Sequence, residues 1–474
     1  MKIIGRAKEQ EELLRFFTSG RPEFVAVTGR RRIGKTYLVR ELFAPHMAFY
    51  FSGASGKNVS NTLQLQQFDR TITEHGGKAQ PASANWGDAF AKLKGLLGAP
   101  TRKRKVIFID ELPWLDSPKS DFLTALDHFW NTFASARSDL MLIVCGSATS
   151  WIVNNLFANR GGLHNRLTGR VYLAPFTLQE SEALLIEHGV ILNRYQIAEC
   201  NMIFGGVPYY LSMFNKSLSL SQNVDKLLFA QGAPLHSEYD ELYRSLFSTA
   251  DRHMLIVEAL SKKQMGLTRE EISTATGIPG GGNLTRTLDE LLLCGFIDKY
   301  ADFTKPKNSA LYRLIDPFTL FWLKYIKDNH SRDEYYWANL QDNSKRRAWS
   351  GYAFEMLCMR HVAQIKRSLG ILGVSSEVTS WRSKSSSPGA QIDMLISRKD
   401  GVINLCEIKY ALHPLTLTAK DDANLQHKRT AFIAETGTKK AVHITMITSL
   451  GLSGNGHRAS VQSEVTLDDL FYCI

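Results

Sequence analysis

One segment, Gly29-Arg-Arg-Arg-Ile-Gly34-Lys35-Thr36, combines glycines with a lysine and a hydroxyl side chain. It matches the pattern G-x4-G-K-[ST], and it follows an apolar run at 24–28 and precedes a helix expected over Tyr37–Phe43. Backbone N–H groups of such a turn surround phosphates, while Lys35 would neutralise the β- and γ-phosphates and the Thr36 hydroxyl would ligate Mg²⁺. The segment therefore predicts binding of ATP or ADP with Mg²⁺ through Gly29, Arg30, Arg31, Arg32, Ile33, Gly34, Lys35, Thr36 and Tyr37.

The apolar run 105–109 ends in two adjacent acids, Asp110 and Glu111. A strand ending there would place Asp110 beside the Mg²⁺ and Glu111 one residue further, where its carboxylate could polarise an attacking water. The alternative for Glu111 is a carboxylate that starts a helix. A third run, 140–145, leads to Ser147, whose hydroxyl would either contact the γ-phosphate or the water, or cap the strand end. The chemistry predicted from these residues is ATP hydrolysis.

A second group of chemically active residues lies near the C-terminus. Asp393 lies on one apolar run, and Glu407 and Lys409 lie on the next, with a turn at 398–401 between the two. A hairpin with period-two alternation places Glu407 and Lys409 on one face, and a matching register would bring Asp393 to that face. Two carboxylates could bind Mg²⁺ or Mn²⁺, and the lysine could orient water or stabilise developing charge, as metal-dependent phosphodiester cleavage requires. An ordinary surface pair between Glu407 and Lys409 is the alternative.

Short apolar runs must position the first group. The runs 24–28, 105–109 and 140–145 are apolar at nearly every position, and helical patterns lie between them. Strands of this kind are buried on both faces, so the fold class predicted is α/β, with the parallel sheet of a P-loop NTPase. The segment 52–89 predicts a loop, a helix and a second loop on the surface of this sheet.

Turn residues and charge runs predict four domains. A P-loop ATPase core covers 1–175, and a turn-broken helical lid covers 176–235. Residues 236–345 predict a winged-helix domain, because three helical patterns are followed by two short strands. A last α/β domain covers 346–474 after a charged break at 342–347.

The predicted winged helix suggests a nucleic-acid contact. Such a domain reads DNA by placing one helix in the major groove, here residues 283–293 with Arg286 exposed. Residues 251–345, however, contain as many acidic as basic residues, whereas phosphate-driven binding requires concentrated Lys and Arg. DNA contact and a module for interdomain or dimer contacts are therefore equal alternatives for this domain.

The composition of the chain bounds its class. It has 474 residues, a formal net charge of +11 and 44% hydrophobic residues, as in globular proteins with some basic surface. No apolar stretch approaches the roughly 20 residues that a membrane helix needs, and early charges leave no signal-peptide core. We expect a soluble cytoplasmic protein without a membrane partner. The six cysteines form no CxxC pair, so we expect no disulfide framework and no zinc site, and all six buried as small hydrophobes.

Several short motifs of the first half occur in an order typical of one ATPase family. They are Ile4-Gly5-Arg6 with Glu9, the segment 29–36, Asp110-Glu111, Gly146-Ser147, Leu163–Arg170 followed by Leu173–Phe176, and Gly205-Gly-Val-Pro208. Together they resemble the archaeal-type ATPase family, a prokaryotic branch of the AAA+/STAND P-loop ATPases. The resemblance implies that Gly5 and Arg6 lie near the adenine and that the turn at Pro208 touches the base or ribose. It makes Arg166 the arginine finger or phosphate sensor, with Arg170 in reserve. The alternatives are a helix stop at Pro208 and a surface ion pair for Arg166.

The C-terminal segment resembles the PD-(D/E)xK nuclease superfamily, and residues 316–474 resemble the domain of unknown function often fused to archaeal-type ATPases. This resemblance implies that the last domain, 346–474, has a restriction-endonuclease-like α/β fold. The resemblance implies a hairpin acid, a Glu-x-Lys motif, a further metal ligand and a basic residue on a following helix, which are Asp393, Glu407 with Lys409, Glu355 and Lys428 respectively. Two departures stand out. No proline precedes Asp393, and Gln391 occupies a place where many active members carry a second acid. The alternative is a decayed nuclease fold that serves for docking.

The sequence as a whole predicts an ATPase that hydrolyses ATP and thereby controls a DNA-associated, nuclease-like module. Its predicted partners are ATP, DNA, and a second copy of the chain or another protein. The rival prediction is a nucleotide switch for DNA or protein binding, with an inactive docking domain. Catalytic roles are assigned to Glu111, Ser147, Arg166 and Lys409, and metal ligation to Thr36, Asp110, Asp393, Glu407 and Glu355.

Overall fold

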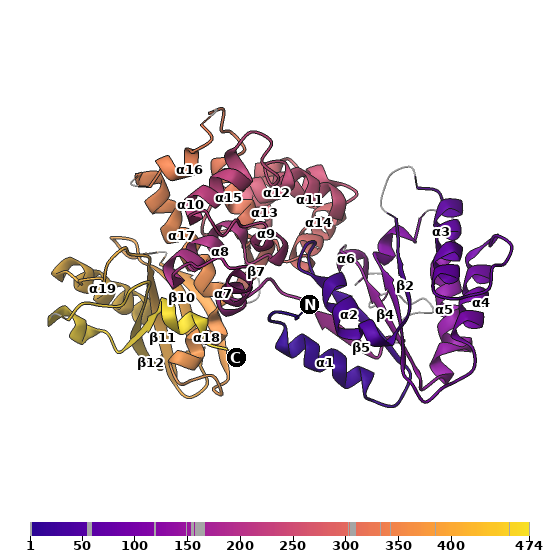
Figure 1. The fold of residues 1–474 in the computed structure, drawn as a ribbon. Coiled ribbons are helices and arrows are strands. Elements are labelled where there is room, and N and C mark those ends of the chain that lie inside the picture. The colour runs from indigo at the N-terminus through magenta and orange to yellow at the C-terminus, as the bar shows by residue number, and fades with distance from the viewer. Residues whose placement is uncertain are drawn as a thin grey trace. The chain divides into compact units, whose positions relative to one another are not determined.

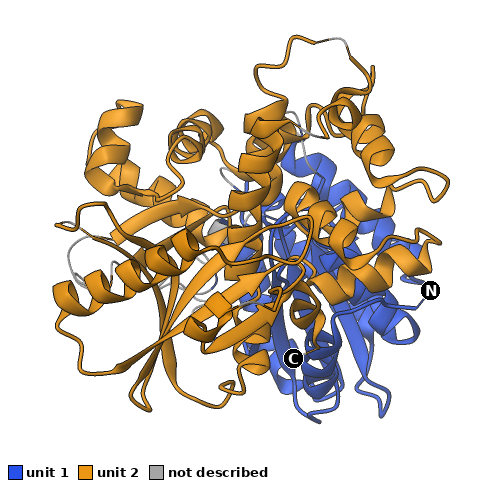
Figure 2. Ribbon diagram, turned by 90° about the vertical axis from the view of Figure 1, so that its left-hand side faces the viewer, with its two compact units in different colours: residues 1–174 blue, residues 175–474 orange. Residues whose placement is uncertain are grey.

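The computed structural model describes residues 2–54, 59–117, 120–147, 149–152, 156, 166–301, 303, 310–331, 333–341, 343–383, 385–454 and 456–473. The chain divides into two units, Met1–Ala174 and Pro175–Ile474 (Figure 2). Across the described ranges, no helix combines the length and the apolar character needed to cross a membrane.

The elements of the first unit alternate between helices and strands (Figure 1). In chain order they are α1 (Ala7–Phe17), β1 (Glu23–Thr28), α2 (Lys35–Phe43), β2 (Met47–Ser52), α3 (Asn61–Glu74), α4 (Trp86–Leu97), β3 (Lys105–Asp110), α5 (Phe122–Thr132), β4 (Leu140–Cys145), α6 (Thr149–Ile152) and β5 (Gly169–Tyr172).

The strands of this unit form a parallel sheet in the order β2-β3-β4-β1-β5. Every residue of β1 and β4 is buried, because α1 and α2 pack on one face of the sheet and α3, α4 and α5 pack on the other. Burial on both faces explains why these strands read as continuous apolar runs. The predicted α/β fold with a parallel sheet is confirmed.

The elements of the first unit that were not expected from the sequence include β2 and α4. The strand β2 lies at the edge of the sheet, where half of its side chains are only partly buried and its apolar pattern is weak. Helix α4 begins inside the second predicted loop. Asn85 caps it, because the Asn85 side chain accepts a hydrogen bond from the backbone N–H of Asp88 at 2.9 Å.

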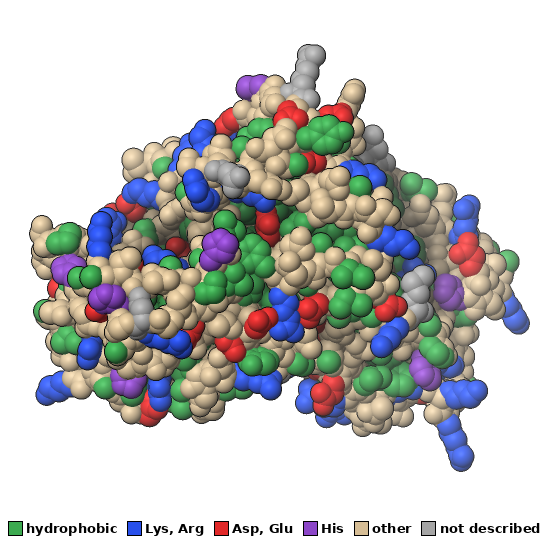
Figure 3. All heavy atoms as spheres, turned by 60° about the vertical axis from the view of Figure 1, so that its left-hand side comes forward, with side chains coloured by type: hydrophobic (Ala, Val, Ile, Leu, Met, Phe, Trp, Pro, Cys, Tyr) green, Lys and Arg blue, Asp and Glu red, His purple; other side chains and the backbone are tan. Residues whose placement is uncertain are grey.

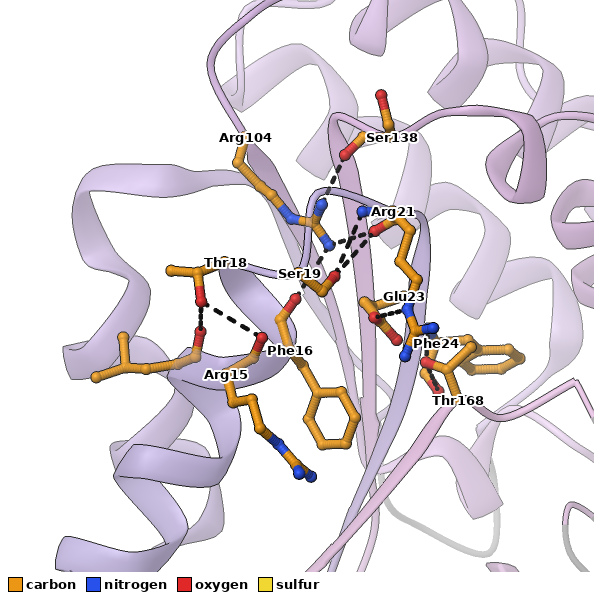
Figure 4. A network of polar contacts seen from close by, with 11 residues as sticks. Arg15, Phe16, Thr18, Ser19, Arg21, Glu23, Phe24, Arg104, Ser138 and Thr168 are labelled. Carbon is orange, nitrogen blue, oxygen red and sulfur yellow. Dashed lines mark hydrogen bonds and ion pairs between the residues drawn. The ribbon is translucent and has the colours of Figure 1, made fainter.

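A polar network holds the end of the sheet where β1 begins (Figure 4). The Arg104 guanidinium donates to three backbone carbonyls, those of Phe16 (3.3 Å), Arg21 (2.7 Å) and Ser138 (2.6 Å). Burial of Glu23 opposes its ionisation, but hydrogen bonds from Thr168, Ser19 and Arg21 hold its pKa below the ordinary value. The network links the end of α1 to the loops before β3 and β4, at the opposite end of β1 from the glycine-rich segment.

The second unit begins with helices and ends with a mixed sheet (Figure 1). Its elements are α7 (Leu178–Glu187), α8 (Arg194–Phe204), α9 (Pro208–Ser212), α10 (Leu220–Val224), α11 (Glu238–Leu246), α12 (Ala250–Ser261), β6 (Leu267–Thr268), α13 (Arg269–Thr276), α14 (Gly282–Leu293), β7 (Ile297–Ala301), β8 (Ala310–Leu314), α15 (Pro317–Tyr325), α16 (Tyr336–Asn339), α17 (Ser344–Arg360), α18 (Val362–Ser368), β9 (Ser376–Arg382), β10 (Gln391–Arg398), β11 (Val402–Lys409), α19 (Ala419–Thr436), β12 (Ala441–Thr448) and β13 (Ser463–Thr466).

Two sheets organise this unit. The strands β6, β8 and β7 form a small antiparallel sheet beside α12, α13 and α14, in the element order expected of a winged helix. The strands β13-β12-β11-β10-β9 form a mixed sheet, in which β10 is antiparallel to both neighbours and β12 is parallel to both. Helix α17 packs on one face of the mixed sheet and α19 on the other.

The predicted boundary between 345 and 346 differs from the structure, because it lies within the first turn of α17. The charged residues there form the exposed start of this helix, and its later turns bury Trp349, Tyr352 and Phe354. One apolar core runs from α7 through α17 to β11, so the helices and the mixed sheet belong to one unit. The expectation of six buried cysteines is also wrong, since Cys473 is exposed.

Candidate functional site

The turn at 29–34 adopts a conformation that depends on its glycines. Gly29 has φ +140°, and a Cβ there would lie 2.5 Å from the carbonyl oxygen of Leu173. Gly34 has φ +91° and directly precedes α2. Lys35, 5% exposed, donates from Nζ to the carbonyls of Gly29 and Arg30, both at 2.9 Å. The ammonium is thereby held over the turn, where it can meet a phosphate.

The predicted acid of β3 contacts the hydroxyl of this segment. The Thr36 Oγ1 donates to Asp110 Oδ2 at 2.6 Å, and the backbone N–H of Glu111 donates to Asp110 Oδ1 at 2.8 Å. A hydroxyl and a carboxylate side by side are hard oxygen donors of the type that Mg²⁺ takes together with water and substrate phosphates. The residues present therefore fit Mg²⁺ at this point.

Ser147 forms hydrogen bonds with Glu111. The sequence singled out both residues but did not indicate this contact. Ser147 donates from Oγ to Glu111 Oε1 at 2.6 Å and from its backbone N–H to Oε2 at 3.3 Å. Glu111 itself has φ +49°, a left-handed conformation uncommon for a residue other than glycine. Both features fix the direction of this carboxylate at the ends of β3 and β4. The sequence did show a polar residue just after the strand β4. The contact with Glu111 could be predicted only by knowing that β4 lies next to β3 in the sheet.

Gly5 and Arg6 lie beside the same turn. Arg6 is buried, has φ +60° and precedes α1. Its guanidinium donates to the carbonyls of Ile33 at 3.2 Å and Ala174 at 2.5 Å. Arg6 thus joins the chain before α1 to the nucleotide-binding turn, which is consistent with a role near the nucleotide and leaves the adenine contact a prediction.

The remaining predicted residues of the turn differ in exposure. Arg30 and Ile33 are buried, Arg31 and Arg32 are half-buried, and Tyr37 is exposed on α2.

The residues known only from the resemblance remain predictions. Arg166 and Arg170 are exposed, and the preceding motif residues 163–165 lie outside the described part of the chain. Pro208 opens α9 in the second unit after Gly205 and Gly206, whose φ values are +70° and +67°. This geometry is that of a helix stop followed by a helix start.

The C-terminal residues also meet, within the second unit. Glu407 is buried, and each of its carboxylate oxygens accepts from one lysine, Lys409 at 2.9 Å and Lys428 at 2.6 Å. The hairpin pairs Met394 with Cys406, and Asp393 Oδ2 accepts from the backbone N–H of Ile408 at 3.3 Å. The contact between Lys409 and Glu407 confirms that the two share a face of β11.

The cluster raises the proton affinity of its acids. The pKa of Glu355 is raised to about 7, by burial and then by Asp393, against the opposing charge of Arg313, whose Nη2 lies 3.5 Å from Glu355. The pKa of Asp393 is raised to about 6, by burial and then by Glu407, against Lys428. Carboxyls with raised pKa values at a shared position are typical of functional sites and of structural ion networks alike.

Among the residues that the structure describes, no three His, Cys, Asp or Glu side chains form a group that could hold a metal ion. Glu407 is engaged by two ammonium groups, and Glu355 is engaged by Arg313. Two of the three predicted ligands of the C-terminal metal are therefore paired with cations, and the role of all three toward Mg²⁺ or Mn²⁺ stays a prediction.

The raised pKa values predict that stability falls as pH rises. The folded values of about 7 for Glu355 and about 6 for Asp393 exceed those of an unfolded chain, about 4.3 and 3.9. The folded state therefore binds more protons, and stability is lost from about pH 4 upward until both carboxyls are ionised above about pH 7. Thermal unfolding at pH 5 and pH 8 should show a smaller difference in Glu355→Gln than in the unmodified protein. Glu377→Gln, an exposed acid on β9, is the control, and equal pH dependence in all three proteins would contradict the prediction.

The parallel sheet, the glycine-rich turn before α2 and the Thr36–Asp110–Glu111 arrangement define a P-loop ATPase. Residues 4–214 match a protein-family model described as an ATPase domain predominantly from Archaea. This part of the chain is therefore similar to ATPase domains of archaeal type, in agreement with the resemblance seen in the sequence.

The chain is also similar to individual proteins. The uncharacterized protein MJECL04 of Methanocaldococcus jannaschii is 24% identical over 368 residues, which cover 77% of this chain and 78% of that protein. The Walker-type ATPase of Pyrococcus abyssi has a TM-score of 0.49 at 17% identity, covering 68% of this chain and 96% of that chain. The ORC2 protein of Aeropyrum pernix has a TM-score of 0.45 at 15% identity, covering 68% and 93%.

Proposed function

We propose that this protein hydrolyses ATP at the P-loop and that its nucleotide state controls a DNA-associated, nuclease-like second unit. The observation that carries the first part is the continuous contact from Thr36 through Asp110 and Glu111 to Ser147. It brings a hydroxyl and two carboxylates to one edge of the sheet, which supports their proposed roles in nucleotide binding, metal binding and general-base catalysis.

Each residue has a distinct task in this proposal. Lys35 neutralises the phosphates, and Glu111 orients the attacking water and accepts its proton. Ser147 keeps the Glu111 carboxylate in place, so it acts as a positioning residue. Thr36 and Asp110 would hold Mg²⁺, which would neutralise phosphate charge when bound.

The nuclease-like role of the second unit rests on the cluster around Glu407. Asp393, Glu407 and Lys409 lie on two adjacent strands, with Lys428 of α19 on the second oxygen of Glu407. Clustered acids beside lysines are the residue types that metal-assisted phosphodiester cleavage uses. The rival proposal is that the second unit serves only for docking. The ion pairs of Glu407 with Lys409 and Lys428 favour it, because they occupy the carboxylate that would otherwise bind the metal.

A plasmid-cleavage assay decides between these roles. Supercoiled DNA is incubated with the full chain and Mg²⁺ or Mn²⁺, with and without ATP, beside the Asp393→Ala and Lys35→Ala variants. Nicking that depends on Asp393 and changes with ATP in the unmodified protein, but not in Lys35→Ala, is the expected result. Absence of Asp393-dependent nicking under all conditions would remove the nuclease and leave the docking proposal.

A further inference from the structure

The second unit contains a groove that the predicted site does not use. It has a volume of about 1250 Å³, larger than the roughly 300–1,000 Å³ of ordinary small-molecule sites. Its walls come from the end of α12, from β8, α15 and α17, and from the end of β9. A ligand that fills it would contact the small antiparallel sheet, α17 and the mixed sheet together.

The charge of the groove is strongly basic. Two of its lysines are neutralised locally, Lys263 by Glu271 at 3.2 Å and Lys327 by Glu258 at 2.5 Å. Four further cations line it, all of them exposed and without an ion pair in the described part of the chain: Lys262, Lys324, Lys345 and Arg382. Asp328 is the acid that remains against these four. Several unpaired cations lining one groove suit a polyanion rather than a single carboxylate.

The predicted recognition helix offers much less charge. Arg286 is the basic residue of α14, and its guanidinium lies 3.7 Å from Glu290. The residue before Glu290, Asp289, is a second acid of this helix. On the face drawn in Figure 3, Lys and Arg side chains are interspersed with acidic and uncharged ones rather than gathered into one broad patch. Phosphate contacts require concentrated cations, so the groove is the better place for them than α14.

The groove leads toward the carboxylate cluster. Lys345, Trp349 and Tyr352 line it from α17, and Glu355 follows three residues after Tyr352 on the same side of the helix. Arg313 of β8 bridges the two regions, because its guanidinium lies over the Tyr352 ring at 5.0 Å and 3.5 Å from Glu355. A chain of phosphates in the groove would therefore reach Arg313 and the cluster behind it.

We propose that this groove binds the sugar-phosphate backbone of a nucleic acid and directs it to the Glu355–Asp393–Glu407 cluster. The inference rests on the proposed DNA association of the second unit, and it replaces the recognition helix by the groove as the contact surface. Recognition is by charge along the backbone, so it is independent of base sequence.

The test is a charge reversal in the groove of the full-length protein. Binding of fluorescein-labelled 30-nucleotide single strands and 30-base-pair duplexes is measured by anisotropy for the unmodified protein and for Lys324→Glu/Lys345→Glu. The affinity of Lys324→Glu/Lys345→Glu for the probes should be at least about tenfold lower than that of the unmodified protein. For the duplex, the slope of the logarithm of the binding constant against the logarithm of the salt concentration should become shallower by about 2. The two probes distinguish single-stranded from double-stranded nucleic acid as the natural ligand.

Lys226→Glu/Lys439→Glu is the matched control, since both lysines are exposed, lie outside the groove and change the net charge equally. It should bind within about twofold of the unmodified protein. Equal losses in both double variants, an unchanged groove variant, or no binding of either probe by the unmodified protein would overturn the groove. Because the groove lies in the second unit, a thermal-unfolding curve equal to that of the unmodified protein is used to show that the groove variant is folded. Plasmid nicking that persists when the groove fails would leave the proposed function standing.

Discussion

Lys35→Ala should lose ATP binding by at least about 100-fold and with it all measurable hydrolysis. The Lys35 ammonium is buried over the P-loop and held by the carbonyls of Gly29 and Arg30. Without it, the phosphates would meet those carbonyls with no neutralising charge, and about 3 kcal/mol of charge-assisted hydrogen bonding would be lost. Calorimetric titration with ATP and Mg²⁺ measures the affinity directly.

The control for this result is Lys8→Ala, an exposed lysine of α1 in the same unit. It should bind ATP like the unmodified protein. Thermal unfolding without nucleotide must also be compared, because Lys35→Ala leaves two carbonyls without their donor, at a cost of about 1–3 kcal/mol. A folded Lys35→Ala protein that binds ATP within a few-fold of normal would contradict the assignment of the P-loop.

Glu111→Gln should separate binding from hydrolysis. The amide keeps the shape of the side chain and can still accept a hydrogen bond from Ser147, while Thr36 and Asp110 are unchanged. It cannot take a proton from water, so steady-state phosphate release should fall about 100- to 1,000-fold. ATP affinity should stay within about threefold, because Glu111 is not asked to bind the phosphates. A turnover near normal would reject Glu111 as the general base.

Ser147→Ala refines the same test. Loss of the Ser147 hydroxyl should lower kcat about tenfold. The KM for ATP should stay nearly unchanged, because Ser147 positions Glu111 rather than the nucleotide. In the Glu111→Gln background it should have little additional effect, since the base it positions is already absent. Glu74→Gln, an exposed acid of α3, is the control for Glu111→Gln, because it also removes one negative charge.

The central strands and the P-loop could be predicted because their signals are local. The strands β1, β3 and β4 are buried on both faces and therefore apolar at successive positions. The edge strand β2 has no such signal, since only one side of it is paired. The start of α17 was misread as a break for a related reason: its first turn is solvent-exposed and charged, and its apolar residues come later.

The carboxylate cluster was predictable only in part. The spacing of Glu407 and Lys409 places them on one face of any strand, and their 2.9 Å contact follows from that period. Arg313 carried no local signal, because it lies 42 positions before Glu355 in the sequence and meets it only through the packing of β8 against α17. The groove lysines come from separate segments of the chain. A net charge counted along the sequence therefore does not reveal that they gather in one groove, because nearby acids balance them in that count.

The sequence by itself determined the P-loop, its acids and the parallel sheet that carries them, because turn geometry and strand burial depend on neighbouring residues. Three contacts were decided by the tertiary structure alone. Ser147 donates a hydrogen bond to Glu111, Arg6 before α1 donates to a carbonyl of the P-loop, and Arg313 forms an ion pair with Glu355. Each of these contacts joins residues far apart in the chain, and its existence depends on strand order and helix packing. Side-chain charge is written in the sequence, but which charges face one another is set by the fold.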